Sequence, residues 1–287
     1  MPDGLLRLRD GRHLSYHIAG PDDGLPLLIF HGWGGSRLTS HPEVSHATAL
    51  GIRLITVDRP GVGFSDQLPG RTILDWPSDI STLADHLQLE HFALLGHSAG
   101  APYALACAHH LCSRACSVTI VSGIGPPSST TGKLFLSDAR AARLLLDRAS
   151  TSTKAMLQIA GGVILSPPIT FLYRSFNRPF ARDGETMLTP AMKDMRITSL
   201  REAFRQGAEG LYDDAVLVLH DWGFSLSEVT HHVRLWHGEA DTLVDVAFGR
   251  QLENELPNCD AVFHRNAGHH LLYIHWREIL ATVKDAA

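Results

Sequence analysis

The sequence predicts an α/β fold in which helices flank a mostly parallel central sheet. Two observations lead to this prediction. Short, unbroken apolar runs of strand length recur along the chain, and such runs are typical of parallel strands covered on both faces. Segments with the apolar spacing of helices fall between these runs, and strands that alternate with helices imply βαβ units and a parallel sheet.

The N-terminal segment is predicted to form a hairpin. Extended runs at 5–9 and 13–18 flank Asp10-Gly11, a dipeptide that favours tight turns. Further apolar runs of strand length follow, and each is predicted to be a strand of the sheet. These runs occupy residues 27–30, 53–57, 92–95, 118–121, 233–236 and 261–263.

The segments between these runs have the spacing of helices. Trp76, Ile80, Leu83 and Leu87 form one apolar stripe, as expected for a helix with one buried face. The alanine-rich segment 99–110 suits a helix packed tightly against a sheet. Further helices are predicted at 249–256 and 270–283.

The alternation of strands and helices stops between Pro126 and about Val229. Leucines and methionines occur there at helical spacing, which predicts a helical insertion. The chain is therefore expected to form one α/β core from residues 1–125 and 230–287, interrupted by a cap, or lid, at 126–229. The residues that suggest helices in this insertion include Leu144, Leu145, Leu146, Met187, Met192 and Met195.

Composition excludes several classes of protein. The chain has 287 residues, of which 44% are hydrophobic and 19% charged, and its net charge is −5. That apolar fraction excludes intrinsic disorder, and the mildly acidic balance gives no reason to expect nucleic-acid binding. No run reaches the ~20 apolar residues of a membrane span, and the N-terminus lacks the apolar segment of a signal peptide, so a cytoplasmic protein is expected. Cys107, Cys112 and Cys116 lack the spacing of a metal site and are predicted to be buried or half-buried free thiols.

The strongest chemical signal is Gly96-His97-Ser98-Ala99-Gly100. This segment directly follows one predicted strand and directly precedes a predicted helix, which is the context that a G-x-S-x-G nucleophile elbow requires. The turn crowds its neighbours, so glycine at both ends keeps it open and raises the serine above the sheet edge. Ser98 is therefore the predicted nucleophile.

A serine hydroxyl needs a base to take its proton, and the base in turn needs an orienting group. His269 follows Gly268 after the last predicted strand and is the preferred base, with His270 as the alternative. Asp241 follows the strand at 233–236 and is the preferred acid. Glu239 and Asp245 are its local competitors.

Two backbone N–H groups are expected to stabilise the oxyanion that forms during acyl transfer. Ala99 supplies one, because it follows the nucleophile at a helix N-terminus. The other is expected from Trp33, through its amide, in the glycine-containing loop 31–36 after the strand at 27–30.

These motifs together resemble those of the α/β-hydrolase superfamily, along nearly all of the chain except the lid. The resemblance implies a helical cap over the active site, inserted after strand six. After the acid, many relatives have Val-Pro where this chain has Val244-Asp245, which keeps Asp245 as a substitute acid. The matching segments are 31–34, 58–65, 96–100, 237–241 and 268–269.

The predicted activity is that of a hydrolase acting on carboxylic-ester-type bonds. An ester, lactone or thioester of a small, apolar molecule would be cleaved through an acyl-enzyme on Ser98, with no metal ion and no other cofactor. Aromatic residues of the lid would line an apolar pocket or pack the lid onto the sheet. These residues are Phe171, Phe176, Phe180 and Phe204.

Three alternatives stay open at this stage. The same triad could hydrolyse a carbon–carbon bond. Carboxylates of the lid could bind a substrate amine, as in an aminopeptidase-like amidase, through Asp183, Glu185, Asp213 or Asp214. Finally, the chain could be a ligand receptor, a lyase or a cyclase on the same scaffold, because a fold does not determine function. The sequence leaves monomer and homodimer equally open.

Overall fold

The computed structural model of the chain describes residues 4–39, 42–126, 133–134, 137–138, 143–144, 150–168, 170–171 and 188–287. Every predicted strand is present at or near its expected position. The strands of the central sheet are β1 (Gly4–Arg7), β2 (His13–Ala19), β3 (Leu25–Phe30), β4 (Ile52–Val57), β5 (Phe92–His97), β6 (Ala115–Val121), β9 (Val233–Gly238) and β10 (Cys259–His264).

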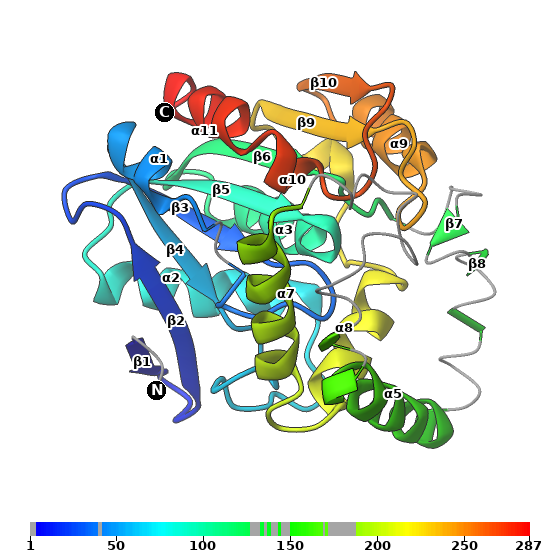
Figure 1. Cartoon of the computed structure of the whole chain (residues 1–287). Coiled ribbons are helices and arrows are strands. Elements are labelled where there is room, and N and C mark those ends of the chain that lie inside the picture. Colours follow the sequence, from blue (N-terminus) through cyan, green and yellow to red (C-terminus); the bar gives the residue numbers. More distant parts are fainter. Residues whose placement is uncertain are drawn as a thin grey trace.

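These strands form an eight-stranded sheet in the order β1-β2-β4-β3-β5-β6-β9-β10 (Figure 1). β2 pairs antiparallel with both β1 and β4, and the remaining neighbours are parallel. The predicted N-terminal hairpin and the predicted mostly parallel sheet are therefore confirmed. Parallel strands end at the same edge of a sheet, so the loops after β3, β5, β9 and β10 converge there.

The helices connect the strands much as predicted. The segment expected at 270–283 forms two helices, because His275 leaves the helical conformation between them. The short helix α1 has no apolar stripe long enough to predict it. The helical elements outside the predicted lid are α1 (Val44–Ala49), η1 (Ile73–Asp75), α2 (Trp76–His86), η2 (Ser98–Gly100), α3 (Ala101–His110), α9 (Val246–Glu255), α10 (Leu271–Ile274) and α11 (Trp276–Asp285).

The sheet separates two hydrophobic cores, as the unbroken apolar strands require. Side chains alternate along a strand, so Leu28 and Phe30 of β3 enter one core while Leu27 and Ile29 enter the other. Figure 1 shows α2 and α3 on one side of the sheet, and α1 and α11 on the other. Both faces of the parallel strands are therefore covered by helices.

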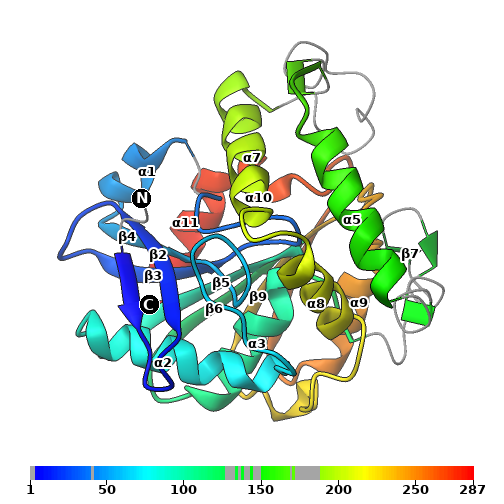
Figure 2. The ribbon, with the colours of Figure 1, turned by 90° about the horizontal axis from the view of Figure 1, so that it is seen from below.

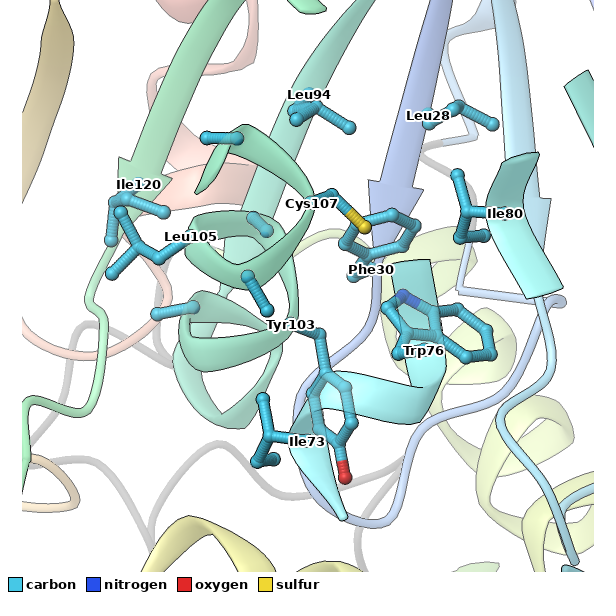
Figure 3. Close-up of a cluster of buried hydrophobic side chains, with 14 of the residues drawn as sticks. Leu28, Phe30, Ile73, Trp76, Ile80, Leu94, Tyr103, Leu105, Cys107 and Ile120 are labelled. Atoms are coloured by element: carbon cyan, nitrogen blue, oxygen red, sulfur yellow. The ribbon is translucent and has the colours of Figure 1, made fainter. Parts of the chain in front are cut away.

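Aromatic rings fill the core between the sheet and helices α2 and α3 (Figure 3). Trp76 meets Phe30 edge to face, with ring centroids 5.4 Å apart, and meets Tyr103 in the same manner at 5.9 Å. Such pairs contribute about 0.5–1.5 kcal/mol each beyond their buried area. Trp76 thereby joins β3, α2 and α3 into one packed unit.

The region expected to form the lid contains helices, as predicted, and also a small antiparallel hairpin that was not predicted. Its described elements are β7 (Lys133–Leu134), β8 (Ser137–Asp138), α5 (Ser150–Ile164), α7 (Pro190–Ala203), α8 (Glu209–Val218) and η5 (Leu226–Glu228). Helix α5 packs beside α8 (Figure 2). The predicted residues that lie outside the described part of the chain are Leu145, Leu146, Phe176, Phe180, Asp183, Glu185 and Met187.

Two further sequence expectations concern cysteines and membranes. Cys107, Cys112 and Cys116 are free thiols, as predicted, but Cys112 is exposed instead of buried because it lies in the turn after α3. Within the described ranges, no helix is long and apolar enough to cross a membrane.

The turn between β5 and α3 leaves no room for side chains at its two glycines. A Cβ on Gly100 would lie 2.1 Å from the carbonyl oxygen of Phe30, and a Cβ on Gly96 would lie 2.8 Å from the carbonyl oxygen of Gly100. Backbone atoms of the central strand cannot move aside as a flexible side chain could. The steric reason given for glycine at both positions is therefore confirmed.

Replacement of Gly100 by alanine is accordingly expected to destabilise the fold. The added methyl group must displace β3, and overpacking of this kind costs roughly 1–3 kcal/mol or more. Gly162→Ala is the matched control, because a Cβ at Gly162 in α5 meets no atom within 4 Å. That control should be neutral or stabilising by up to about 1 kcal/mol. Equilibrium unfolding in urea measures both changes, and equal stability of Gly100→Ala and the unaltered protein would contradict the steric account.

Candidate active site

Ser98 stands at the end of the central strand β5 in a strained backbone conformation. Its φ is +55°, in the left-handed region that residues with a Cβ rarely adopt. Its carbonyl accepts a hydrogen bond from the N–H of Ile124 at 3.2 Å, which helps to hold the turn. Strain of this kind costs of order 1–3 kcal/mol and persists where the surrounding structure imposes it, often at functional sites.

The loop 31–36 after β3, called here the oxyanion loop, lies against Ser98. A Cβ on Gly32 would come within 3.1 Å of the Ser98 Cβ and 3.5 Å of its Oγ. Glycine at this position therefore lets the loop backbone approach the serine closely. Two amides are expected to bind an oxyanion. The Trp33 amide belongs to this loop, and the Ala99 amide belongs to the residue that follows Ser98.

The Trp33 side chain fixes the loop to the rest of the protein. Its indole Nε1 donates to the carbonyl of Leu211 in α8 at 2.8 Å. Its ring packs against Val62, Ala203 and Leu211. The indole is thus engaged with α8, in agreement with the expectation that Trp33 would bind an oxyanion through its backbone amide and not through its ring.

His269 and Asp241 come together at the carboxyl ends of β10 and β9. The His269 Nδ1 donates to Asp241 Oδ2 at 2.8 Å. The other carboxylate oxygen, Oδ1, accepts from the amides of Leu243 and Val244 at 2.9 and 2.8 Å. Although burial alone would raise the pKa of Asp241, its interactions with His269 hold that pKa below the ordinary value of an aspartate. The carboxylate is therefore ionised, oriented and aimed at the imidazole.

The competing residues have other partners. Asp245 caps helix α9, where its Oδ1 accepts from the Ala247 amide at 2.9 Å. Glu239 lies 3.3 Å from Arg250 at the surface. His270 stands at the N-terminal cap position of α10, and its Nε2 accepts from Arg196 at 3.1 Å. Among these candidates, the geometry pairs Asp241 with His269.

Three further histidines are buried at the same edge of the sheet. The ring of His97 lies 5.2 Å from that of His269, and burial holds the pKa of His97 well below its ordinary value. Burial also lowers the pKa of His237, whose Nε2 donates to the Val244 carbonyl at 3.0 Å. His31 donates through Nδ1 to the Gly32 carbonyl at 2.9 Å, and burial beside Arg59 lowers its pKa to about 3. All three are neutral near pH 7, so none of them places a competing positive charge beside His269.

A buried ion-pair network that the sequence does not predict lies behind the oxyanion loop. Asp214 of α8 is fully buried and binds Arg59 and Arg71, which are also buried. Tyr103 of α3 donates to the same carboxylate at 2.9 Å. Burial alone would raise the pKa of Asp214, but the two guanidinium groups hold it far below the ordinary value. Arg59 stands in a segment matched by the resemblance, whereas nothing local to Asp214 marks it.

A second buried network joins helix α7 to the loop after β4. Arg37 binds Asp58 at 2.7 Å and Glu202 of α7 at 2.6 Å. The amide of Arg37 also donates to Asp58, at 2.6 Å. α7 and α8 are thus each tied to the core by a buried carboxylate. In the described part of the chain, no group of three or more histidine, cysteine or acidic side chains is arranged to hold a metal ion.

The depressed pKa of His31 predicts a specific loss of stability in acid. Between its ordinary pKa of 6.5 and about 3, the unfolded chain binds a proton at His31 that the folded chain excludes. The free energy of unfolding therefore falls as the pH falls through this window, by about 1.4 kcal/mol per pH unit for this one group.

Replacement by glutamine tests this linkage, because glutamine keeps a side-chain donor but does not titrate. Unfolding of His31→Gln in guanidinium between pH 6 and pH 4 should show a pH dependence shallower by about 1.4 kcal/mol per unit. His91→Gln, at an exposed position, is the matched control. Parallel pH profiles for His31→Gln and the unaltered protein would show that the imidazole is not held neutral.

Comparisons with known proteins agree with this architecture. A family model described as the alpha/beta hydrolase fold matches residues 26–149. A non-heme chloroperoxidase of Streptomyces lividans is 34% identical over 98 residues, which are 34% of this chain and 36% of that protein. The chain spans between about a third and a half of the length of the first curated relatives that it matches.

Two comparisons extend along nearly the whole chain. A bifunctional esterase/perhydrolase of Acinetobacter calcoaceticus is 23% identical over 256 residues, 88% of this chain and 87% of that protein. The solved structure of a hydrolase from Pseudomonas aeruginosa has a TM-score of 0.72 at 17% identity, and the match covers 98% and 97% of the two chains. The family model, these likenesses and the observed sheet together show that the chain has the α/β-hydrolase fold.

Proposed function

We propose that this protein is a serine hydrolase with the triad Ser98, His269 and Asp241. It cleaves an ester, lactone or thioester bond of a small, apolar molecule. The observation that carries this proposal is the buried 2.8 Å hydrogen bond between His269 and Asp241 at the sheet edge where Ser98 is held at positive φ. An ionised, oriented carboxylate behind an imidazole is the arrangement that makes a histidine a base for a serine hydroxyl.

The proposed reaction proceeds in two half-reactions. His269 Nε2 takes the proton of Ser98 Oγ as this oxygen attacks the carbonyl carbon, and the amides of Trp33 and Ala99 stabilise the resulting oxyanion. His269 then gives the proton to the leaving oxygen or sulfur, which leaves an acyl group on Ser98. A water molecule, deprotonated by the same imidazole, attacks the acyl group and releases the acid. Asp241 stays ionised and stabilises the imidazolium in both steps.

The side chains around the site favour an uncharged acyl group over a substrate amine. Asp214, one of the carboxylates considered for amine binding, is fully buried and already binds two arginines. Leu200 of α7 lies beside the oxyanion loop, 3.2 Å from where a Cβ of Gly34 would stand. An apolar side chain at the oxyanion loop supports an apolar substrate. Leu200 belongs to the proposed cap at 126–229, so the cap would contribute this apolar contact.

Two substitutions test the triad directly. Ser98→Ala should abolish the hydrolysis of p-nitrophenyl acetate and butyrate, with a loss in kcat of about 10³-fold or more. Asp241→Asn should lower kcat by about 10³–10⁴-fold, because an asparagine can hold the wrong imidazole tautomer. Steady-state kinetics on short esters and lactones measure both losses.

Asp245→Asn is the matched control for Asp241→Asn. Asparagine caps a helix about as well as aspartate, so this variant should keep kcat within about threefold of the unaltered protein. Full turnover by Ser98→Ala would exclude the triad. Loss of turnover in Asp245→Asn together with its retention in Asp241→Asn would move the acid role to Asp245. Tight binding of esters without turnover in the unaltered protein would favour a ligand receptor.

A further inference from the structure

We infer that helix α8 positions the peptide unit that supplies one half of the oxyanion hole, through the ion pair between Asp214 and Arg59. This inference rests on the proposed function, since it gives a role to the oxyanion loop of that same site. It makes Asp214, Arg59 and His31 positioning residues, which act on the reacting atoms only through the Gly32–Trp33 peptide.

The argument begins with the carbonyl oxygen of Gly32. His31 Nδ1 donates to it at 2.9 Å and Arg59 Nη2 at 3.4 Å, so two side chains hold one oxygen. This carbonyl belongs to the same planar peptide unit as the N–H of Trp33. Because C=O and N–H point in opposite directions across a trans peptide, donors that fix the oxygen also fix where the N–H points. The Trp33 amide is the group proposed to bind the oxyanion.

Arg59 is itself held in place from α8. Its Nε donates to Asp214 Oδ2 at 2.7 Å, while its Nη1 donates to the His31 carbonyl at 2.6 Å. The guanidinium thus bridges the carboxylate of α8 and two successive carbonyls of the oxyanion loop. Both Arg59 and Asp214 are fully buried, where water neither competes for these bonds nor screens the charges.

The second oxygen of Asp214 anchors the carboxylate to the core. Arg71 Nη2 and the Tyr103 hydroxyl donate to Oδ1 at 2.6 and 2.9 Å. Figure 3 shows the Tyr103 hydroxyl pointing away from the packed side chains of the core. Asp214 is therefore held from one side while it holds Arg59 on the other.

Two additional contacts join α8 to the same region. The Trp33 indole donates to the Leu211 carbonyl, one turn before Asp214. Gly210 and Gly61 meet backbone to backbone, since a Cβ on Gly210 would lie 2.4 Å from the Gly61 oxygen. Helix α8 is thus tied to three successive residues of the oxyanion loop. It contacts Trp33 directly, and it holds His31 and Gly32 through Arg59. Trp33 and Leu211 are 178 residues apart in the sequence.

The orientation of the Gly32–Trp33 peptide matters because oxyanion donors act over a narrow range of distance. They must lie about 2.7–3.1 Å from the developing charge, and a displacement of about 1 Å can cost up to about 100-fold in rate. Loss of Asp214 would free Arg59 and thereby loosen the Gly32–Trp33 peptide. Substrate binding would change little, because the ground-state carbonyl depends less on this donor than the transition state does.

Asp214→Asn tests the inference against Glu202→Gln, which removes a buried carboxylate from the other network that ties a lid helix to the core. Kinetics with p-nitrophenyl butyrate and amide hydrogen exchange of residues 31–34 are measured below the onset of unfolding. Asp214→Asn should lower kcat about 10- to 100-fold, leave KM within about threefold, and speed exchange in 31–34. Glu202→Gln should lose thermal stability but keep kcat within about threefold and exchange in 31–34 unchanged.

Unchanged kcat and exchange in folded Asp214→Asn, or equal losses in both variants, would overturn the inference. If Asp214→Asn does not fold, Trp33→Phe takes its place, because it removes the indole bond to Leu211 but keeps an aromatic ring. It should lower kcat and speed exchange in 31–34, and unaltered values would overturn the role of α8. Absence of ester turnover in the unaltered protein would defeat the proposed function instead, and hydrogen exchange alone would then decide the positioning role.

Discussion

The steric constraint at the end of β5 governs the arrangement of the whole site. Phe30 and Gly100 approach so closely that a side chain at Gly100 is excluded, and the chain must turn sharply from strand to helix. Ser98 is thereby forced to a φ of +55° at the edge of the central sheet. Because the neighbouring strands are parallel, the loops that carry Trp33, Asp241 and His269 end at that same edge. The site thus follows from the sheet topology and one tight turn.

Buried ion pairs also tie helices α7 and α8 to the core. Asp214 of α8 binds Arg59, and Glu202 of α7 binds Arg37, with all four side chains buried. Buried ion pairs are weak contributors to net stability, because desolvation offsets much of the attraction. Their directional bonds nevertheless disfavour any other placement of the helices. The inferred role of the Asp214–Arg59 pair is to determine position at the oxyanion loop, whereas the Glu202–Arg37 pair ties α7 to the core.

The features that sequence predicts well here are those encoded by short local patterns. Continuous apolar strands, the elbow around Ser98 and the loops with Asp241 and His269 each carry their signal within a few residues. The Arg59–Asp214 pair has no such signal, because its partners are 155 residues apart and nothing local to Asp214 marks it. The break at His275 was missed because an apolar stripe continues across it. The sequence already favours Asp241 over Asp245, and the coordinates add a separate role for Asp245 as the cap of α9.

The central claim, that Ser98 is a nucleophile activated by His269, is tested most directly by the site of covalent modification. The unaltered protein is incubated with a fluorophosphonate, and the adduct is located by tandem mass spectrometry of its peptides. The account predicts one phosphonyl group per chain, on Ser98, with esterase activity lost in proportion to labelling. Stoichiometric labelling of another residue, or full ester turnover after complete labelling of Ser98, would contradict it.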